Sequence, residues 1–313
     1  MKCLIIDRVA PIIAEELGKH MEVETKILPS HDELKELIAD IDVLIMRVDP
    51  KITKDILDAA NNLKVIGVCS VGLNHIDLDA AKEKGIEVYN APGLNANAVA
   101  ELTISKMLDI SRGTMEANND VKVKHEWDKY KFEGRELRGR TVGIMGFGRI
   151  GRRVGELARA FHMNVIAYDP YLKPEDFEKE NAKGMSVEEL LKEADYITIH
   201  VPLTDETKDL VSAKSIETMK DDAVVLNMSR GGIVNEKDMY EALKAGKIGG
   251  YATDVLENEL AGEGLTGNDE FTSPLFECEN FIVSPHLGAQ TVDAAHDIGV
   301  FIVGKIKEVL SLG

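Results

Sequence analysis

The sequence is poor in cysteine, and this shortage excludes two kinds of stabilisation. The chain of 313 residues contains only three cysteines, Cys3, Cys69 and Cys278, and no Cys-x-x-Cys pair. Three cysteines cannot all pair with one another, and these do not have the spacing of zinc ligands. We therefore expect no disulfide framework and no metal site. We also expect a cytoplasmic protein, in which thiols stay reduced.

Basic residues are scarce as well. The chain has 37 lysines and arginines against 55 aspartates and glutamates, which gives a net charge of −18. Such a chain lacks the positive surface that nucleic acids and anionic lipid headgroups require. We expect its partners to be small molecules, with no nucleic acid and no membrane among them.

Long apolar runs are missing too. Runs such as Leu4–Ile6 and Val43–Met46 are far too short to cross a bilayer. Asp7 and Arg8 directly follow the first of these runs, so we expect no signal peptide. Apolar residues nevertheless make up 44% of the chain, which is enough for a folded core.

What the sequence does contain is a regular alternation of strand and helix patterns. At roughly 150 residues per domain, the length predicts two domains. Such alternation is typical of a parallel sheet with helices on both faces, so we assign the α/β class. In the first third we predict strands at 2–6, 23–28, 43–46, 64–68 and 87–89, and helices at 11–20, 32–39, 54–60 and 77–84.

A second alternating series follows a long helix. Apolar residues recur with helical spacing over 97–115, which predicts one continuous helix. The polar segment 122–137, with the only tryptophan, is interpreted as an arm or linker. The acidic stretch 258–278 is interpreted as a functional or mobile loop. Further strands are predicted at 141–145, 164–168, 196–200, 223–227, 250–254 and 281–284, and a last helix at 291–310.

A glycine-rich turn follows the strand at 141–145. Gly146, Gly148 and Gly151 form the pattern Gly-x-Gly-x-x-Gly between that strand and an amphipathic helix. In such a turn the first glycine permits the tight bend, the second lets the backbone approach a pyrophosphate, and the third lets helix and strand pack closely. Asp169 ends the next strand, where a carboxylate accepts the ribose hydroxyls and repels a 2′-phosphate. The pattern therefore predicts a dinucleotide site that prefers NAD to NADP.

Three later strands are each followed by chemically active side chains. Arg230 lies in a Ser-Arg-Gly-Gly turn after one strand, Glu257 and Glu259 follow the next, and His286 lies in Pro-His-Leu-Gly-Ala after the last. Ligands bind beyond the carboxyl ends of the strands in an open parallel sheet, so we expect these groups to converge where a nicotinamide would lie. A guanidinium matches a planar carboxylate, and an imidazole exchanges protons near neutral pH. His200 also follows a strand, and spacing alone does not separate it from His286.

Taken in order, these motifs resemble those of the D-isomer-specific 2-hydroxyacid dehydrogenases. The resemblance covers nearly the whole chain and includes Tyr-Asp-Pro at 168–170 and His-Val-Pro-Leu at 200–203. It implies an NAD-dependent enzyme that transfers hydride between a D-2-hydroxy acid and its 2-oxo acid. It also implies that Arg230 binds and polarises the substrate, that His286 is the acid and base, and that Glu259 pairs with His286. The family usually has proline after this glutamate, where Leu260 stands here, so Glu257 is kept as the alternative partner.

The same resemblance implies two sets of contacts. The implied cofactor contacts are Gly146, Gly148, Arg149, Ile150, Gly151, Asp169, Pro202, Thr207, Met228, Ser229, Asp254 and Gly288. The implied substrate contacts are Arg47, Val71, Gly72, Asn95 and Lys129. In the family, backbone N–H groups of the Val-Gly turn hold the substrate carboxylate, and an arginine at the position of Arg47 meets a phosphate. Lys129 lies in a segment that can reach a neighbouring subunit's site, so a homodimer is implied.

Within this family, the chain looks most like the short form of the D-3-phosphoglycerate dehydrogenases. That predicts 3-phosphoglycerate as the substrate and a role in serine biosynthesis, with hydroxypyruvate, glyoxylate or another 2-oxo acid as the alternative. The resemblance also implies that a Rossmann-type cofactor domain, 97–288, is inserted into a flavodoxin-like substrate domain made of 1–96 and 289–313. No residues are left for the C-terminal regulatory domain of longer relatives, so we do not expect feedback control by serine.

Two other interpretations use the same pattern. Some transcriptional co-repressors resemble this family and use NADH as a signal for assembly, but we see no appended tail of the kind they carry. Formate dehydrogenases pair a glutamine with the histidine, and Glu259 argues against them. We therefore predict an NAD-dependent dehydrogenase.

Overall fold

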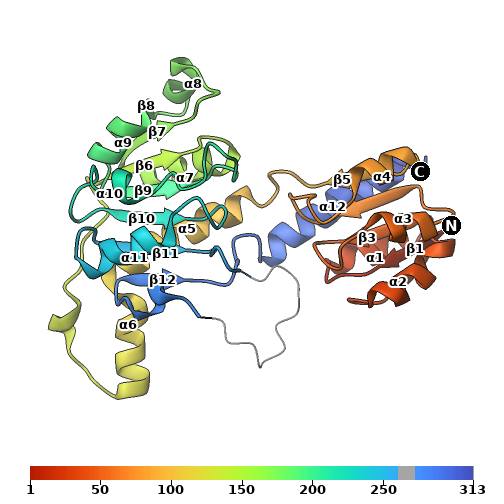
Figure 1. The fold of residues 1–313 in the computed structure, drawn as a ribbon, viewed down its shortest axis with the longest axis horizontal. Coiled ribbons are helices and arrows are strands. Elements are labelled where there is room, and N and C mark those ends of the chain that lie inside the picture. The colour runs from red at the N-terminus through yellow and green to blue at the C-terminus, as the bar shows by residue number, and fades with distance from the viewer. Residues whose placement is uncertain (260–271, 313) are drawn as a thin grey trace. The chain divides into compact units, whose positions relative to one another are not determined.

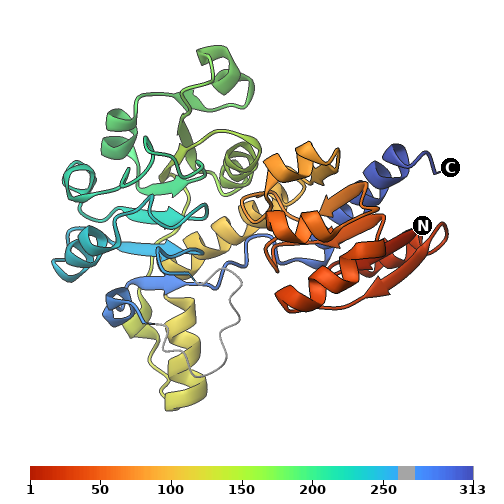
Figure 2. The ribbon, with the colours of Figure 1, turned by 45° about the vertical axis from the view of Figure 1, so that its right-hand side comes forward.

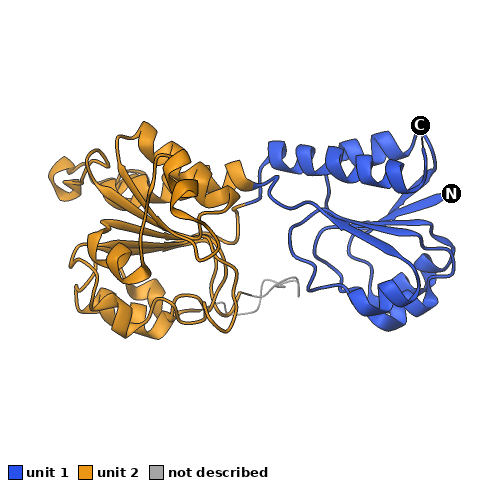
Figure 3. Ribbon diagram, turned by 90° about the horizontal axis from the view of Figure 1, so that it is seen from above, with its two compact units in different colours: residues 1–95, 261–264, 289–313 blue, residues 96–260, 265–288 orange. Residues whose placement is uncertain are grey.

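The computed structural model describes residues 1–259 and 272–312. These residues divide into two compact units, which Figure 3 shows in different colours. Unit 1 contains Met1–Asn95 and Ala289–Gly313, and the described part of unit 2 contains residues 96–259 and 272–288. Along the chain, the residues of unit 2 therefore lie between the two parts of unit 1.

Unit 1 is built on a five-stranded sheet in the order β2-β1-β3-β4-β5, in which every neighbouring pair is parallel. This is the strand order of flavodoxin-like folds. The strands are β1 (Lys2–Ile5), β2 (Glu22–Thr25), β3 (Val43–Met46), β4 (Val65–Val68) and β5 (Glu87–Asn90). The helices are α1 (Pro11–Leu17), α2 (His31–Leu37), η1 (Ile38–Asp40), α3 (Lys54–Ala59), α4 (Leu78–Glu83) and α12 (Val292–Val309).

The central strands of unit 1 are apolar on both faces because helices cover both faces. Every residue of β3 is buried, and its side chains alternate between two cores. Leu44 and Met46 join the core with α2, α3 and α4, whereas Val43 and Ile45 join the core with α1 and α12. In β4, a Cβ on Gly67 would lie 2.6 Å from the side chain of Ile302, so the absence of a side chain lets α12 approach the sheet.

Unit 2 is built on a seven-stranded parallel sheet in the order β12-β11-β10-β9-β6-β7-β8. Counted from β6, this is the Rossmann order with one further strand. The strands are β6 (Thr141–Met145), β7 (Asn164–Tyr168), β8 (Lys183–Gly184), β9 (Tyr196–Ile199), β10 (Val224–Asn227), β11 (Gly250–Thr253) and β12 (Phe281–Val283). The helices are α5 (Ala96–Arg112), α6 (Thr114–Asn119), η2 (Asp120–Lys124), η3 (Lys129–Phe132), α7 (Arg149–Ala160), α8 (Pro174–Lys179), α9 (Val187–Glu193), α10 (Ala213–Ile216), α11 (Glu236–Lys244) and η4 (Pro274–Glu277).

Helices again cover both faces of the sheet in unit 2, as Figure 1 shows. Buried side chains of α5 and α7 form one core with the sheet, and those of α9, α10 and α11 form another core on the opposite face. Every residue of β9 and β10, at the middle of the sheet, is buried. The predicted α/β class with two parallel sheets is confirmed.

The prediction of one continuous helix over 97–115 is wrong. The helix α5 ends at Arg112, and Gly113 has a φ of 59°, which breaks the helix before α6 begins. The carbonyl of Ser111, which a continuous helix would bond to residue 115, accepts the N–H of Arg135 at 2.9 Å. The left-handed Gly113 ends the helix, the N–H of Arg135 satisfies a carbonyl of its last turn, and α6 extends away from the sheet in both Figure 1 and Figure 2.

The remaining expectations about the fold concern the acidic loop, the cysteines and membrane spans. Residues 260–271 of the predicted 258–278 loop lie outside the described residues. All three cysteines are buried free thiols. Within the described ranges, no group of three or more His, Cys, Asp or Glu residues is placed to hold a metal ion, and no helix is long and apolar enough to span a bilayer.

Candidate active site

The predicted chemical groups of unit 2 all lie at one edge of its sheet. Because every strand is parallel, the segments that follow the strands meet at the same edge. The glycine turn follows β6, Asp169 follows β7, and the turn with Pro202 and Thr207 follows β9. On the other side of β9, the three adjacent strands β10, β11 and β12 lead to Arg230, Glu259 and His286, respectively.

The glycine turn is held by backbone bonds and by close packing. Gly146 has a φ of 88°, and its N–H donates to the carbonyl of Tyr168 at 2.8 Å. A Cβ on Gly151 would lie 2.1 Å from the carbonyl oxygen of Gly146, so any side chain there would push helix and turn apart. A Cβ on Gly148 would meet no atom of the described residues within 4 Å. The space beside Gly148 is therefore open, and the space beside the other two glycines is filled by the protein.

Asp169 links the glycine turn to the end of β7. Its Oδ2 accepts the N–H of Phe147 at 2.9 Å, and its Oδ1 accepts the N–H of Tyr171 at 3.0 Å. Each carboxylate oxygen can accept a second hydrogen bond, and the residue is only partly buried. The carboxylate is thus fixed in place with acceptor capacity left for hydroxyl groups.

Arg230 projects from a turn that a buried asparagine holds together. Asn227, at the end of β10, is 1% exposed. Its Oδ1 accepts the N–H and the hydroxyl of Ser229 at 3.1 and 2.9 Å, and its Nδ2 donates to the carbonyl of Arg230 at 2.9 Å. The guanidinium of Arg230 is exposed and donates to the carbonyl of Ser229 at 2.6 Å.

The segment that carries Arg230 packs directly on the segment that follows β11. A Cβ on Gly231 would lie 2.3 Å from the carbonyl oxygen of Leu256 and 2.8 Å from the backbone nitrogen of Glu257. Only glycine allows two backbones to come this close. The side chain of Glu257 is directed to the N–H of Glu236, at 3.4 Å, rather than to His286.

Glu259 and His286 form the central pair of the site. Nδ1 of His286 lies 3.2 Å from both carboxylate oxygens of Glu259. A carboxylate only accepts hydrogen bonds, so this contact assigns the hydrogen to Nδ1 and leaves Nε2 with a free lone pair. The side chain of His286 is 51% exposed, and that of Glu259 is 31% exposed. The imidazole is therefore oriented by Glu259 and open to a small molecule.

The backbone of His286 is held in an unusual conformation by Asp254. His286 has a φ of 53°, which is rare for a residue with a side chain. Its N–H donates to the carbonyl of Asp254 at 2.9 Å. The carboxylate of Asp254, 3% exposed, accepts from the hydroxyl of Ser284 and from the N–H groups of Leu287 and Gly288 at 2.6 to 2.8 Å. Asp254 thereby fixes the loop on both sides of His286, and its predicted contact with the cofactor stays a prediction.

In unit 1, the predicted substrate contacts lie at the carboxyl ends of three adjacent strands. Arg47 follows β3, Val71 and Gly72 lie in the turn after β4, and Asn95 lies beyond β5. The structure gives no acceptor for the N–H groups of Val71 and Gly72 among the residues it describes. Nη1 of Arg47 donates to Oε1 of Gln290 at 2.9 Å. Two backbone donors and one partly exposed guanidinium therefore lie at this edge of the sheet.

Lys129 lies in η3, on the exposed segment after α6. Trp127 and Tyr130, beside it, are 87% and 81% exposed. The predicted contact of Lys129 with a neighbouring subunit and the predicted homodimer stay predictions.

Comparison with known proteins decides the family. Residues 104–288, more than half of the chain, match the profile described as "D-isomer specific 2-hydroxyacid dehydrogenase, NAD binding domain". The chain belongs to the D-isomer specific 2-hydroxyacid dehydrogenase family. The predictions of this family and of an NAD-binding domain are thereby confirmed.

Two curated relatives in this family differ in the activity that their names state. A D-3-phosphoglycerate dehydrogenase of Methanocaldococcus jannaschii is 43% identical over 304 residues, which are 95% of this chain and 55% of that protein. A hydroxypyruvate reductase of Thermotoga maritima is 38% identical over 294 residues, which are 94% of this chain and 92% of that protein. The chain thus spans about half the length of the D-3-phosphoglycerate dehydrogenases that it matches.

A solved structure of the family shows the same fold over the whole chain. The D-lactate dehydrogenase of Aquifex aeolicus, complexed with NAD and lactic acid, has a TM-score of 0.82 and 29% sequence identity. The match covers 99% of this chain and 96% of that chain.

In the present chain, the residues around the glycine turn have the shape and the hydrogen-bonding groups that NAD requires. Helix α7 begins at Arg149 with no side-chain cap and no acidic residue in its first turn, so the partial positive charge of its N-terminus is not neutralised locally and favours phosphates. The open space beside Gly148 would admit a pyrophosphate, and Asp169 keeps acceptor capacity for ribose hydroxyls. The turn after β6 and Asp169 after β7 would thus serve as a phosphate cradle and a ribose acceptor on adjacent strands.

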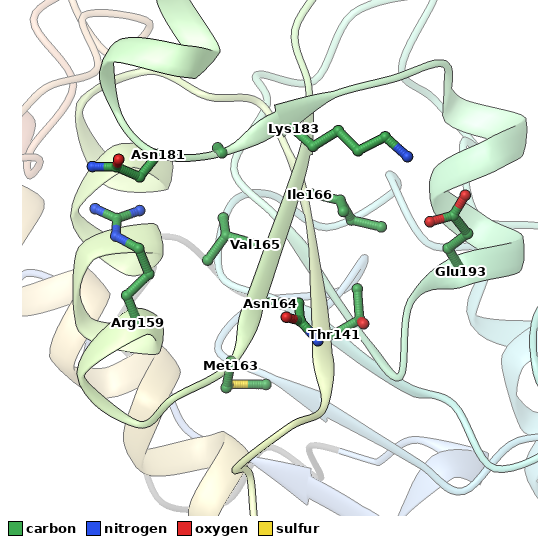
Figure 4. A pocket seen from close by; sticks show the side chains of 10 residues that line it. Thr141, Arg159, Met163, Asn164, Val165, Ile166, Asn181, Lys183 and Glu193 are labelled. Carbon is green, nitrogen blue, oxygen red and sulfur yellow. The ribbon is translucent and has the colours of Figure 1, made fainter.

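The pocket in Figure 4 is separate from the candidate active site. It has a volume of about 610 Å³, and Figure 4 shows Thr141 and Asn164 in its wall. These are the first residues of β6 and β7, whereas the glycine turn follows the last residue of β6. The pocket is therefore at the opposite edge of the sheet from the cofactor and catalytic residues.

His200, the competitor of His286 in the sequence, is in a different environment. Nε2 of His200 contacts the hydroxyl of Thr198 at 2.9 Å, and Nδ1 is buried with no hydrogen-bond partner among the described residues. Burial lowers the pKa of His200 to about 3. An imidazole with this pKa stays neutral at physiological pH, which makes His200 unsuited to exchanging protons there.

We predict that His200 makes the protein sensitive to acid. The histidine has an ordinary pKa of about 6.5 when the chain is unfolded, so its stabilising effect is complete above that pH and is lost as pH falls toward about 3. Between about pH 7.5 and about pH 4.5, the free energy of unfolding should fall by about 2–3 kcal/mol more in the wild type than in a His200→Gln variant. Urea unfolding at the two pH values measures this difference. Parallel losses in the two proteins would contradict the prediction.

The sequence prediction missed Asn227 and Glu236, and it missed the positioning role of Asp254, which it gave only as a cofactor contact. Asn227 closes the turn of Arg230, three residues further along the chain, whereas Asp254 and Glu236 each join segments that are distant in the sequence. Asn227 had a usable signal, because a polar residue that ends a buried strand two residues before a serine is typical of a turn closed by its side chain. The positioning role of the two carboxylates has no such local signal.

Proposed function

We propose that this chain catalyses the NAD-dependent interconversion of a D-2-hydroxy acid and its 2-oxo acid. The observation that carries the proposal is the pair of His286 and Glu259, held 3.2 Å apart at the same sheet edge as Arg230 and the glycine turn. An oriented imidazole, a guanidinium and a dinucleotide cradle are the groups that such a reaction requires.

In this proposal each residue has a separate task. During oxidation, Nε2 of His286 takes the proton of the substrate hydroxyl while the hydride leaves C2, and in the reverse direction it returns the proton to the carbonyl oxygen. Glu259 orients the imidazole and stabilises the imidazolium that forms. Arg230 pairs with the substrate carboxylate and polarises the carbonyl. NAD, when bound, accepts or supplies the hydride.

The N–H groups of Val71 and Gly72 are proposed to donate to the substrate carboxylate, with Asn95 as a further contact. Two adjacent backbone donors without internal acceptors suit an anion. The protein has a net charge of −18, so a fixed set of donors is needed to attract anionic substrates.

For the substrate we propose 3-phosphoglycerate, which would place the reaction in serine biosynthesis. Support comes from Arg47, which would meet the phosphate, and from the names of relatives at 33–43% identity. Hydroxypyruvate is the second candidate, because the Thermotoga maritima relative of this name is matched over 92% of its length.

A substrate panel tests the proposal and separates the two candidates. Purified protein is assayed with NADH and 3-phosphohydroxypyruvate, hydroxypyruvate, glyoxylate or pyruvate, and the panel is repeated with Arg47→Ala. We expect kcat/KM for the phosphorylated acid to fall about 10- to 100-fold in the variant, since a charged hydrogen bond is lost, with little change for the others. An equal loss for all four acids would exclude the phosphate role, and no NADH oxidation with any acid would exclude the proposed function.

A further inference from the structure

The beginning of α11 and the turn after β11 are joined by an exchange of hydrogen bonds between two glutamates. The backbone N–H of Glu257 donates to Oε1 of Glu236 at 2.6 Å, and the backbone N–H of Glu236 donates to Oε1 of Glu257 at 3.4 Å. Asn235 already caps the helix, because its Oδ1 accepts the N–H of Asp238 at 3.1 Å. The carboxylate of Glu236 is therefore not used as the cap of its own helix and is committed to a segment 21 residues further along the chain.

This arrangement brings two like charges together. Burial, followed by the charge of Glu257, raises the pKa of Glu236 above its usual range. Two carboxylates this close repel each other. Each is held in place because it accepts a hydrogen bond from a backbone N–H of the other segment. The short hydrogen bond that the half-buried carboxylate of Glu236 accepts from the N–H of Glu257 gives the turn a defined position.

The turn that Glu236 holds is the one that carries Glu259. The N–H of Glu259 donates to the carbonyl of Leu256 at 3.2 Å, which closes the turn, and its carboxylate contacts Nδ1 of His286. The same carbonyl of Leu256 lies against Gly231, the neighbour of Arg230 in sequence. One anchored turn therefore adjoins both the histidine pair and the arginine.

We propose that Glu236 is a positioning residue for the dehydrogenase reaction, which fixes the turn 256–259 and thereby holds Glu259 opposite His286. This inference rests on the proposed function, because it assumes that Glu259 and His286 act on the substrate. Glu236 itself touches neither substrate nor cofactor. Its effect comes from the reach of its acceptor oxygen and not from its charge.

A graded series of variants tests this role. Glu236→Gln keeps an acceptor oxygen at the same reach, Glu236→Asp keeps the charge but withdraws the oxygen by about 1.5 Å, and Glu236→Leu removes the acceptor. The control is Glu241→Leu, an exposed position on the same helix. Steady-state kinetics with hydroxypyruvate and NADH, NADH affinity by fluorescence, and hydrogen exchange of the Glu257 amide are measured on the full chain.

We expect kcat to fall about 10- to 100-fold in Glu236→Leu, because a displacement on the order of 1 Å in a reacting group has an effect of this size. Glu236→Asp should be intermediate, Glu236→Gln should stay within about threefold of the wild type, and NADH affinity should be unchanged in all of them. The Glu257 amide should exchange faster in the leucine and aspartate variants only.

Several outcomes would overturn the inference. Wild-type kcat in Glu236→Leu, or a larger loss in Glu236→Gln than in Glu236→Asp, would exclude a role for the acceptor oxygen. A parallel loss of NADH affinity would indicate general loss of structure instead. An inactive wild type would refute the proposed function, and amide exchange would then still report on whether Glu236 holds the turn.

Discussion

A His286→Gln variant should reduce NADH-dependent reduction of the 2-oxo acid by about 10²- to 10⁴-fold in kcat. Glutamine occupies a similar volume and can still contact Glu259, but its amide does not exchange protons near neutral pH. NADH affinity should be close to that of the wild type, because the glycine turn follows β6 whereas His286 follows β12, and three strands lie between β6 and β12 in the sheet. Stopped-flow or steady-state kinetics, with NADH binding measured separately, gives both quantities.

A second histidine provides the matched control for this result. His296 lies exposed on α12, and His296→Gln should retain full activity. Glu259→Gln should have a smaller effect than His286→Gln, since an amide oxygen still orients Nδ1 but no longer stabilises the imidazolium. A His286→Gln enzyme with wild-type kcat would remove His286 as the acid and base.

Much of the fold could be predicted because buried strands leave a strong local signal. The predicted strands at 43–46 and 141–145 agree with β3 and β6 residue for residue, since each is a run of mostly buried residues between turns. The boundary between α5 and α6 could not be predicted, because apolar spacing continues to Met115. The boundary lies at the left-handed Gly113, the N–H of Arg135 bonds the carbonyl of Ser111 there, and Met115 beyond it is 52% exposed.

The catalytic candidates could be placed at one sheet edge for a similar reason. Each follows a buried strand, and parallel strands bring such positions together. The choice of Glu259 over Glu257 as the neighbour of His286 could not be made from spacing, since the two residues are two positions apart in one turn. The bonds of Glu257 with Glu236, a residue of another segment, direct it away from the histidine.

Substitution of Gly148 and Gly151, one at a time, should separate an effect on NADH binding from an effect on the stability of the fold. We expect Gly148→Ala to weaken NADH binding by about 10-fold or more, because its methyl group would enter the open space predicted to hold the pyrophosphate and would displace charged hydrogen bonds there. The added methyl group would meet none of the described atoms within 4 Å, so the free energy of unfolding should stay closer to that of the wild type than in a Gly151→Ala variant. Fluorescence titration with NADH and urea unfolding measure the two effects.

Gly151→Ala should behave differently although it is only three residues away. Its methyl group would lie 2.1 Å from the backbone oxygen of Gly146, an atom that cannot move without displacing the turn. Overpacking of this kind costs about 1–3 kcal/mol or more, so this variant should lose stability as well as NADH affinity. If Gly148→Ala were to bind NADH as tightly as the wild type, the pyrophosphate could not lie against Gly148. The cofactor site would then lie elsewhere along this sheet edge. This conclusion would hold even if Gly151→Ala were still less stable than Gly148→Ala.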